Sequence, residues 1–218
     1  MSALNNKSNK LESILNLEIH PIDKPEFRSK CKSMLDKDGV LVLNEFLSVE
    51  SIQSILEEAK QQEHLAYFCV NEHNVYLEPF DNQYAKNHAR NRTVVSSKGC
   101  ITDDQVPSDS ALRALYNSND FKSFLCNVLG EKALYKYDDN LSSINIHYAR
   151  DGQELGWHFD NSSFAITLLI QKPLAGGEFE YIRDFRDSKN NDNNYDQVTD
   201  LINDRFKAKK LAMENGSL

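Results

Sequence analysis

Long apolar runs and blocks of basic residues are both missing from this sequence of 218 residues. No stretch approaches the roughly 18 apolar residues needed to cross a bilayer, and the amino terminus carries no apolar signal segment. The net charge is −8 and the pI is about 5.3, which argues against partners such as nucleic acid or an anionic membrane. We therefore expect a cytoplasmic protein whose partner is a small-molecule substrate.

Cysteine pairs are also missing. The four cysteines, Cys31, Cys69, Cys100 and Cys126, are scattered, and none is spaced as C-x-x-C. Such spacing would suggest a zinc cage or a redox dithiol, so the sequence predicts reduced thiols and neither kind of site. A chain of this length can bury a substantial core without disulfides.

Helix signals dominate the first part of the chain. Residues 1–20 are polar enough for a mobile leader, and we assign 21–218 to one domain whose amino-terminal half, to about residue 135, is helical. A helical period over 24–35 precedes a turn and a short apolar strand at 40–43. Ser48 is placed to cap the next helix, residues 70–106 are irregular, and Ser110 opens two helices that end at Gly130.

Strand patterns replace helical ones from about residue 141. Residues 143–148, 157–160 and 177–181 alternate between polar and apolar, and 164–170 is continuously apolar. An asparagine and aspartate run at 187–196 reads as a surface loop, followed by a short helix at about 198–206. Because nothing helical joins the strands between 141 and 181, an α+β fold with an antiparallel barrel or sandwich is predicted.

The motif that carries chemistry is His158-Phe159-Asp160. Side chains two residues apart on a strand share a face, so His158 and Asp160 would point to one place, and Phe159 away from it. An imidazole and a carboxylate are two of the three protein ligands in a two-histidine, one-carboxylate iron(II) site. We predict that His158 and Asp160 are metal ligands.

The segment around this motif resembles the core of the iron(II)- and 2-oxoglutarate-dependent dioxygenases. The matching features are Tyr148, Gly152, the H-x-D motif, the apolar run 167–170, and Gly176-Gly177-x-Phe179. Residues 38–48 are similar to the amino-terminal strand and helix of the phytanoyl-hydroxylase-like branch. The nearest likeness is to bacterial oxygenases that act on free amino acids, some of which halogenate.

The resemblance implies a double-stranded β-helix, also called a jelly roll and related to cupins, with Fe(II), 2-oxoglutarate and O2 as cofactor and cosubstrates. It places Tyr148 and Thr167 at the 2-oxoglutarate, and it implies no catalytic residue beyond the metal site. The implied reaction is hydroxylation of a small polar substrate, possibly a free amino acid. Halogenating relatives replace the metal-binding carboxylate by a small residue, so Asp160 favours hydroxylation.

Four further residues are candidates for contacting the substrate. Asn145 and His147 share a strand face near the expected mouth of the barrel, and the alternative for His147 is a structural role at the rim. Arg90 and Arg92 could pair with a substrate carboxylate, although loop arginines are more often solvated. His64, His73 and His88 are dispersed through the irregular region, and we do not expect them to supply a third ligand.

Histidine is absent after His158, and this absence qualifies the functional interpretation. Family members carry a second iron-binding histidine and, about ten residues later, an arginine for 2-oxoglutarate. The interpretation is a reading frame truncated within the carboxy-terminal strands. The alternative function is a catalytically inactive homologue or binding module, with self-association expected at the sheet edge left unpaired.

Overall fold

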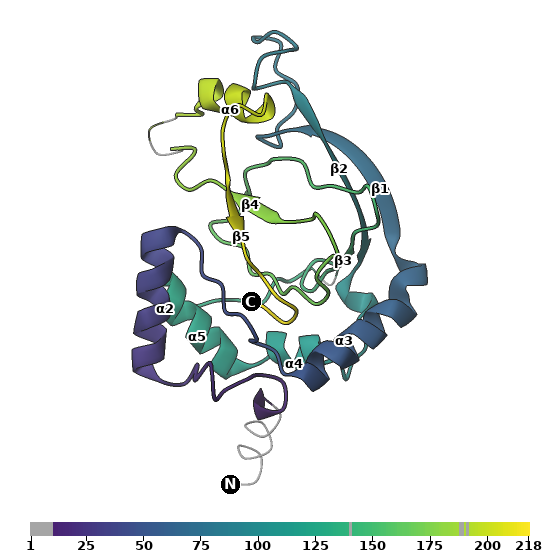
Figure 1. The fold of residues 1–218 in the computed structure, drawn as a ribbon, viewed down its shortest axis with the longest axis vertical. Coiled ribbons are helices and arrows are strands. Elements are labelled where there is room, and N and C mark those ends of the chain that lie inside the picture. The colour runs from purple at the N-terminus through teal and green to yellow at the C-terminus, as the bar shows by residue number, and fades with distance from the viewer. Residues whose placement is uncertain (1–10, 140, 188–189, 191) are drawn as a thin grey trace.

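The computed structural model describes residues 11–139, 141–187, 190 and 192–218, and it has an α+β architecture (Figure 1). The elements in chain order are helices α2 (Pro25–Asp38) and α3 (Val49–Gln62), the 3-10 turn η1 (Glu63–Leu65), strands β1 (Tyr67–Asn74) and β2 (Thr93–Ile101), the 3-10 turn η2 (Asp103–Gln105), helices α4 (Ala111–Tyr116) and α5 (Asn119–Leu129), strands β3 (Ile146–Tyr148) and β4 (Phe179–Tyr181), helix α6 (Tyr195–Ile202) and strand β5 (Lys209–Leu211).

Three helix boundaries lie at residues that the sequence marked, namely Ser48, Ser110 and Gly130. The Ser48 hydroxyl accepts the Ser51 N–H at 3.2 Å and caps α3. Ser110 and Ser118 cap α4 and α5 in the same way. Gly130 ends α5 at φ 75°, a left-handed conformation that glycine adopts without strain. The predicted helices are therefore confirmed, although the last one lies at 195–202 rather than 198–206.

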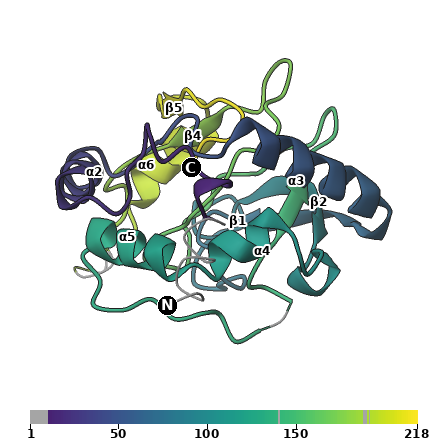
Figure 2. The ribbon, with the colours of Figure 1, turned by 90° about the horizontal axis from the view of Figure 1, so that it is seen from below.

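Two hydrophobic clusters make up the core. In the first, α2 and α5 lie side by side (Figure 2) and bury Phe46, Ile55 and Phe124. Leu11, Ile14 and Leu15 are buried in the same cluster, so residues 11–20 are part of the packed domain and not of a mobile leader. Residues 1–10 lie outside the described part of the chain. The second cluster joins the ends of β1 and α6 and buries Val75, Tyr76, Phe185, Val198 and Leu201.

The strands form two small antiparallel sheets, ordered β1-β2-β3 and β4-β5, on opposite sides of the fold (Figure 1). The longest strands, β1 and β2, fall in the region that the sequence indicated as irregular. β1 is mostly exposed or half-buried, and the buried side of β2 consists of Ser97, Gly99 and Ile101. Neither strand therefore shows the alternation of apolar and polar residues by which a half-buried strand is recognised. Among the described residues β1 pairs with β2 alone. Self-association at an edge where a further carboxy-terminal strand would pair stays a prediction.

Within the described residues there is no closed barrel, so the predicted jelly roll is not seen as paired strands. The run at 164–170 makes one isolated bridge, between Leu169 and Ser217. Its side chains Leu168 and Ile170 pack against the first hydrophobic cluster. A continuous apolar run fits this role as well as it fits a strand. Residues 40–43 likewise form no strand, although Leu43 exchanges two backbone hydrogen bonds with Leu218.

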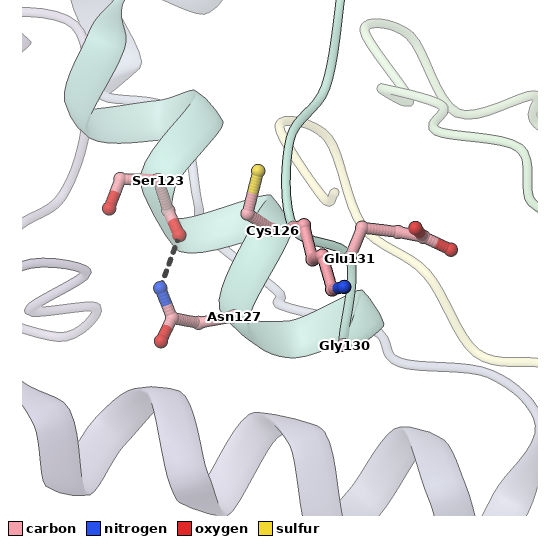
Figure 3. Close-up of a pocket in the computed structure, with 6 residues that line it drawn as sticks. Ser123, Cys126, Asn127, Gly130 and Glu131 are labelled. Atoms are coloured by element: carbon pink, nitrogen blue, oxygen red, sulfur yellow. Dashed lines mark hydrogen bonds between the residues drawn. The ribbon is translucent and has the colours of Figure 1, made fainter.

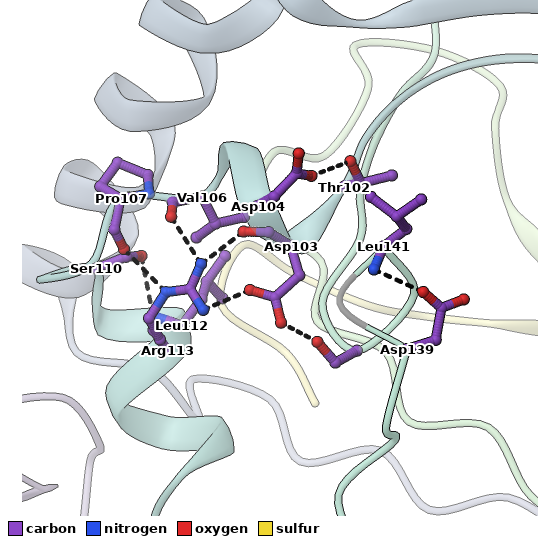
Figure 4. Close-up of polar contacts among 11 residues, drawn as sticks. Thr102, Asp103, Asp104, Val106, Pro107, Ser110, Leu112, Arg113, Asp139 and Leu141 are labelled. Carbon is purple, nitrogen blue, oxygen red and sulfur yellow. Dashed lines mark hydrogen bonds and ion pairs between the residues drawn. The ribbon is translucent and has the colours of Figure 1, made fainter.

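A partly buried ion pair fixes the chain between β2 and β3 (Figure 4). The Arg113 guanidinium pairs with the carboxylate of Asp103 and donates to the carbonyl oxygens of Asp103, at 2.5 Å, and Val106, at 2.8 Å. The other carboxylate oxygen of Asp103 accepts the Ser143 hydroxyl. The segment that leads into β3 is thereby tied to the end of β2. None of the described helices is long and apolar enough to span a membrane.

Candidate functional site

His158 lies on a segment that continues the line of β3 along β2. After the turn at 150–153, the Ser97 N–H donates to the Glu154 carbonyl at 2.6 Å, and the Glu154 N–H donates to the Ser97 hydroxyl at 3.0 Å. The Phe159 N–H donates to the Val75 carbonyl at 2.8 Å. These bonds hold residues 154–159 against the first sheet without forming a regular strand.

The two predicted metal ligands lie together. His158 Nε2 is 3.5 Å from Asp160 Oδ1, and both side chains are partly exposed. Phe159 packs into the second hydrophobic cluster instead, so the side chains of the H-x-D motif are divided as the strand pattern predicted. His158 Nδ1 lies 2.8 Å from the Gly156 carbonyl. A carbonyl can only accept, so this nitrogen carries the proton and Nε2 of the neutral ring has its lone pair directed away.

The donor chemistry of this pair fits iron(II) in two positions. Ligand atoms bound at right angles about 2.1 Å from one metal ion lie roughly 3 Å apart, so the observed spacing requires only a small adjustment. Across the described residues, no group of three or more His, Cys, Asp or Glu side chains is arranged to hold a metal ion. As metal ligands, the pair would supply two members of a larger set.

A polar face of the first sheet adjoins His158. Residues directly opposite in the β1–β2 register share a face, and one face carries His73, Ser96 and Lys98. The rings of His73 and His158 lie edge to face, with centroids 6.0 Å apart. Nothing in the sequence marked Ser96 or Lys98 as site residues, and His73 was not expected to be a ligand. The three residues form a group only in the register of β1 with β2, which the sequence does not show.

His147 reaches the same polar face, where its Nε2 lies 3.5 Å from Lys98 Nζ. Desolvation of the ring lowers the pKa of His147, and the Lys98 ammonium lowers it further. Asn145 is nearby, with its amide oxygen 3.5 Å from Cys100 Sγ. His147 is paired with Cys100, four positions along β2 from Ser96, which corresponds to roughly 13 Å. The structure thus puts Asn145 and His147 on the predicted face but not beside His158.

Tyr148 lies on the opposite face. Its hydroxyl donates to the Ala59 carbonyl of α3 at 2.6 Å, and its ring packs near Phe68. Burial, followed by the nearby Glu63 carboxylate, raises the pKa of Tyr148. Because neighbouring residues on a strand point to opposite faces, Tyr148 and His147 cannot both face His158. Thr167 is exposed on the segment between His158 and Leu169.

Both predicted substrate arginines are engaged elsewhere. Arg92 donates to the Asn203 side chain at 2.6 Å and to the Ile202 carbonyl at 3.3 Å, which holds the end of α6. Arg90 donates to the Pro79 carbonyl at 2.9 Å. Neither guanidinium is brought to His158 by these contacts.

A model of the family described as Halogenase D matches residues 24–217. The chain belongs to the halogenase D family. The match covers α2 through the carboxy-terminal bridge to Leu169, and it includes the second hydrophobic cluster, most of the first, and the H-x-D motif. No curated protein matches the chain. Membership in the halogenase D family indicates that the chain is an enzyme. The match does not identify its cofactors.

Two hollows on the surface of this halogenase D member lie apart from the H-x-D motif. One is at the end of α5 and is lined by Ser123, Cys126, Asn127, Gly130, Glu131 and Lys132 (Figure 3). The other is lined by Tyr84, His88 and residues 192–196. No predicted site residue lines either hollow. In the second, the rings of Tyr84, His88 and Tyr195 pack on one another and form part of its lining.

Proposed function

We propose that the chain is an iron(II)- and 2-oxoglutarate-dependent oxygenase that hydroxylates a small polar substrate, possibly a free amino acid. The observation that carries this proposal is the His158–Asp160 pair, in which Nε2 lies 3.5 Å from the carboxylate and Nδ1 is engaged by the Gly156 carbonyl. It is supported by the match to the halogenase D family and by the resemblance of the sequence around residues 145–181 to the jelly-roll core of these oxygenases. His158 and Asp160 would hold the iron.

Iron(II) at this place would supply oxygen activation coupled to decarboxylation of 2-oxoglutarate. The chain's own contribution begins with His158, whose Nδ1 proton is held on the Gly156 carbonyl. This bond orients the ring and keeps the lone pair of Nε2 available to bind a metal ion. Asp160 adds a negative charge, which offsets the charge of a divalent metal ion.

Hydroxylation is favoured over halogenation because Asp160 is a carboxylate. A halide needs the coordination position that a small residue leaves open, and Asp160 occupies it. We expect the product to gain one oxygen atom, also in the presence of excess chloride. Mass spectrometry of a free amino-acid panel incubated with the enzyme checks this outcome, and a product that gains chlorine would contradict it.

Lys98 is the cation we assign to the distal carboxylate of 2-oxoglutarate. It lies on the polar face two residues from Ser96, which is roughly 7 Å along the strand. Its ammonium lies 3.5 Å from His147 Nε2, and it would turn toward His158 to meet the cosubstrate. A charge-assisted hydrogen bond to a carboxylate contributes about 1.5–3 kcal/mol. Lys98→Ala should therefore raise the 2-oxoglutarate concentration for half saturation roughly tenfold or more, whereas the loop variant Lys86→Ala should not.

An anaerobic titration with iron(II) and 2-oxoglutarate tests the proposal. A chelated cosubstrate at iron gives a visible charge-transfer band, and we expect a saturable band that is lost in His158→Ala and in Asp160→Ala. His64→Ala and Asp109→Ala change exposed residues of the same types and should keep the band. Retention of the band in His158→Ala would reject the assigned ligands.

A noncatalytic binding module is the second candidate. It is favoured by one observation, which is that the described residues contain no group of three metal-donor side chains. It predicts no charge-transfer band and no 2-oxoglutarate turnover in the unmodified chain with iron, oxygen and the amino-acid panel. The same titration therefore separates the two functions.

A further inference from the structure

Ser96 lies at the centre of a chain of hydrogen bonds that ends at His158. Its hydroxyl oxygen accepts the Gly156 N–H at 2.9 Å and lies 2.7 Å from His73 Nε2. On the other side of that ring, His73 Nδ1 lies 3.0 Å from the Asn74 carbonyl. Gly156 in turn accepts the Nδ1 proton of His158 through its carbonyl, at 2.8 Å.

The Asn74 carbonyl, at one end of this series of hydrogen bonds, determines the direction of the bonds that follow it. The Asn74 carbonyl can only accept, so a neutral His73 carries its proton on Nδ1 and presents a bare Nε2. The Ser96 hydroxyl therefore donates to His73 and retains a lone pair for the Gly156 N–H. All donors and acceptors are satisfied in one arrangement, and both nitrogens of His73 are occupied, which makes His73 unsuited to be a metal ligand itself.

The backbone of Gly156 can take part only because it has no side chain. A Cβ at this position would lie 2.6 Å from the Val95 carbonyl oxygen and 2.7 Å from Val94 Cγ2. Segment 154–158 is thus pressed directly onto β2. The ring of His73 also stands edge-on to the ring of His158, so His158 is held from its backbone side and from one flank of its ring.

We propose that Ser96 and His73 are positioning residues for His158, which they orient by fixing the Gly156 peptide and the flank of the imidazole. The inference rests on the proposed function in that His158 is taken as the metal ligand. Groups that orient ligands through hydrogen bonds typically contribute 10- to 100-fold to metal affinity. Neither residue touches the metal or substrate in this proposal.

The first measurement does not involve metal. Nitrogen-15 NMR at pH 8.5, about two units above the ordinary imidazole pKa, reports which ring nitrogen of His158 carries the proton, and His158→Gln identifies its signals. We expect the Nδ1–H form in the unmodified protein and a mixture of tautomers in Ser96→Ala and His73→Phe. Ser96→Thr keeps a hydroxyl and should restore the single form.

The second measurement is the dissociation constant for Co²⁺, a spectroscopic probe for the iron site. Ser96→Ala should weaken Co²⁺ binding about tenfold, whereas Ser96→Thr, Thr93→Val at the start of β2, and His64→Phe should not. Thermal unfolding of each variant shows that the fold is kept.

Three results separate the two proposals. If Ser96→Ala and His73→Phe leave both the tautomer and the Co²⁺ affinity of the unmodified protein unchanged, the positioning role is overturned. If the tautomer changes but the unmodified protein does not bind Co²⁺, the positioning role stands and the proposed function fails. A His158 that is protonated on Nε2 in the unmodified protein also overturns the positioning role.

Discussion

Gly156 is the residue whose replacement gives the sharpest test of how closely the His158 segment approaches β2. In Gly156→Ala the new Cβ would meet the Val95 carbonyl oxygen, which belongs to the backbone and cannot rotate away. We expect a loss of about 1–3 kcal/mol in the free energy of unfolding, typical of overpacking, measured by urea denaturation. Gly99→Ala meets only the ring of Phe68 and should cost less. Equal stability of Gly156→Ala and the unmodified protein would contradict the close approach.

At the residue scale, the His158–Asp160 pair could be predicted from the sequence, but the residues that surround it could not. The period of a strand was enough to place both side chains on one side of the chain and Phe159 on the other, as the structure has them. Ser96 and His73 are 60 and 85 residues away from Gly156 and His158, counted as 156 − 96 and 158 − 73. The register of β1 with β2 brings His73 to Ser96, and the hydrogen bonds of Glu154 and Gly156 to β2 bring the His158 segment to both.

At the scale of elements, Arg92 shows how a residue predicted to bind substrate can serve the fold instead. Its guanidinium holds the last turn of α6 through Asn203 and Ile202. Hydrogen bonds from a charged group contribute about 1.5–3 kcal/mol, so Arg92→Ala should lower the free energy of unfolding by that amount. Arg205→Ala removes an exposed ion pair with Asp200 and should change it by less than about 0.5 kcal/mol. A stable Arg92→Ala variant with weakened substrate binding would show instead that Arg92 contacts the substrate.

Helices and sheets differ in how far local sequence determines them. The caps at Ser48, Ser110 and Ser118 are local signals, and the helices follow them. Strands β1 and β2 depend on each other across a separation of many residues. The buried side of β2 carries Ser97 and Gly99 as well as Ile101, so its sequence does not alternate between apolar and polar. The predicted strand at 177–181 is confirmed as β4 because its alternation is matched by pairing with β5.

At the scale of the whole molecule, the last three residues join parts of the chain that lie far apart in sequence. Leu43 and Leu218 exchange two backbone hydrogen bonds, Leu47 donates to Gly216, and Leu169 exchanges bonds with Gly216 and Ser217. The Ser217 hydroxyl, which is fully buried, also donates to the Asn44 side chain at 2.7 Å. No sequence pattern predicted this arrangement, because each bond joins residues whose separation exceeds any local period.

Deletion of residues 216–218 should therefore destabilise the entire fold rather than one end of it. Six backbone hydrogen bonds are lost, the five named above and the bond from the Ser217 N–H to the Glu214 carbonyl. At about 1 kcal/mol each, they are a large part of the roughly 5–15 kcal/mol typical of a domain. Glu214→Ala removes an exposed ion pair with Lys172 just before this segment and should leave stability nearly unchanged. Urea denaturation followed by circular dichroism measures both variants. The bonds connect the first hydrophobic cluster to Leu169, which follows Asp160 in the chain, so the deletion should also weaken Co²⁺ binding at His158. A deletion variant with unaltered stability would show that these contacts do not hold the fold together.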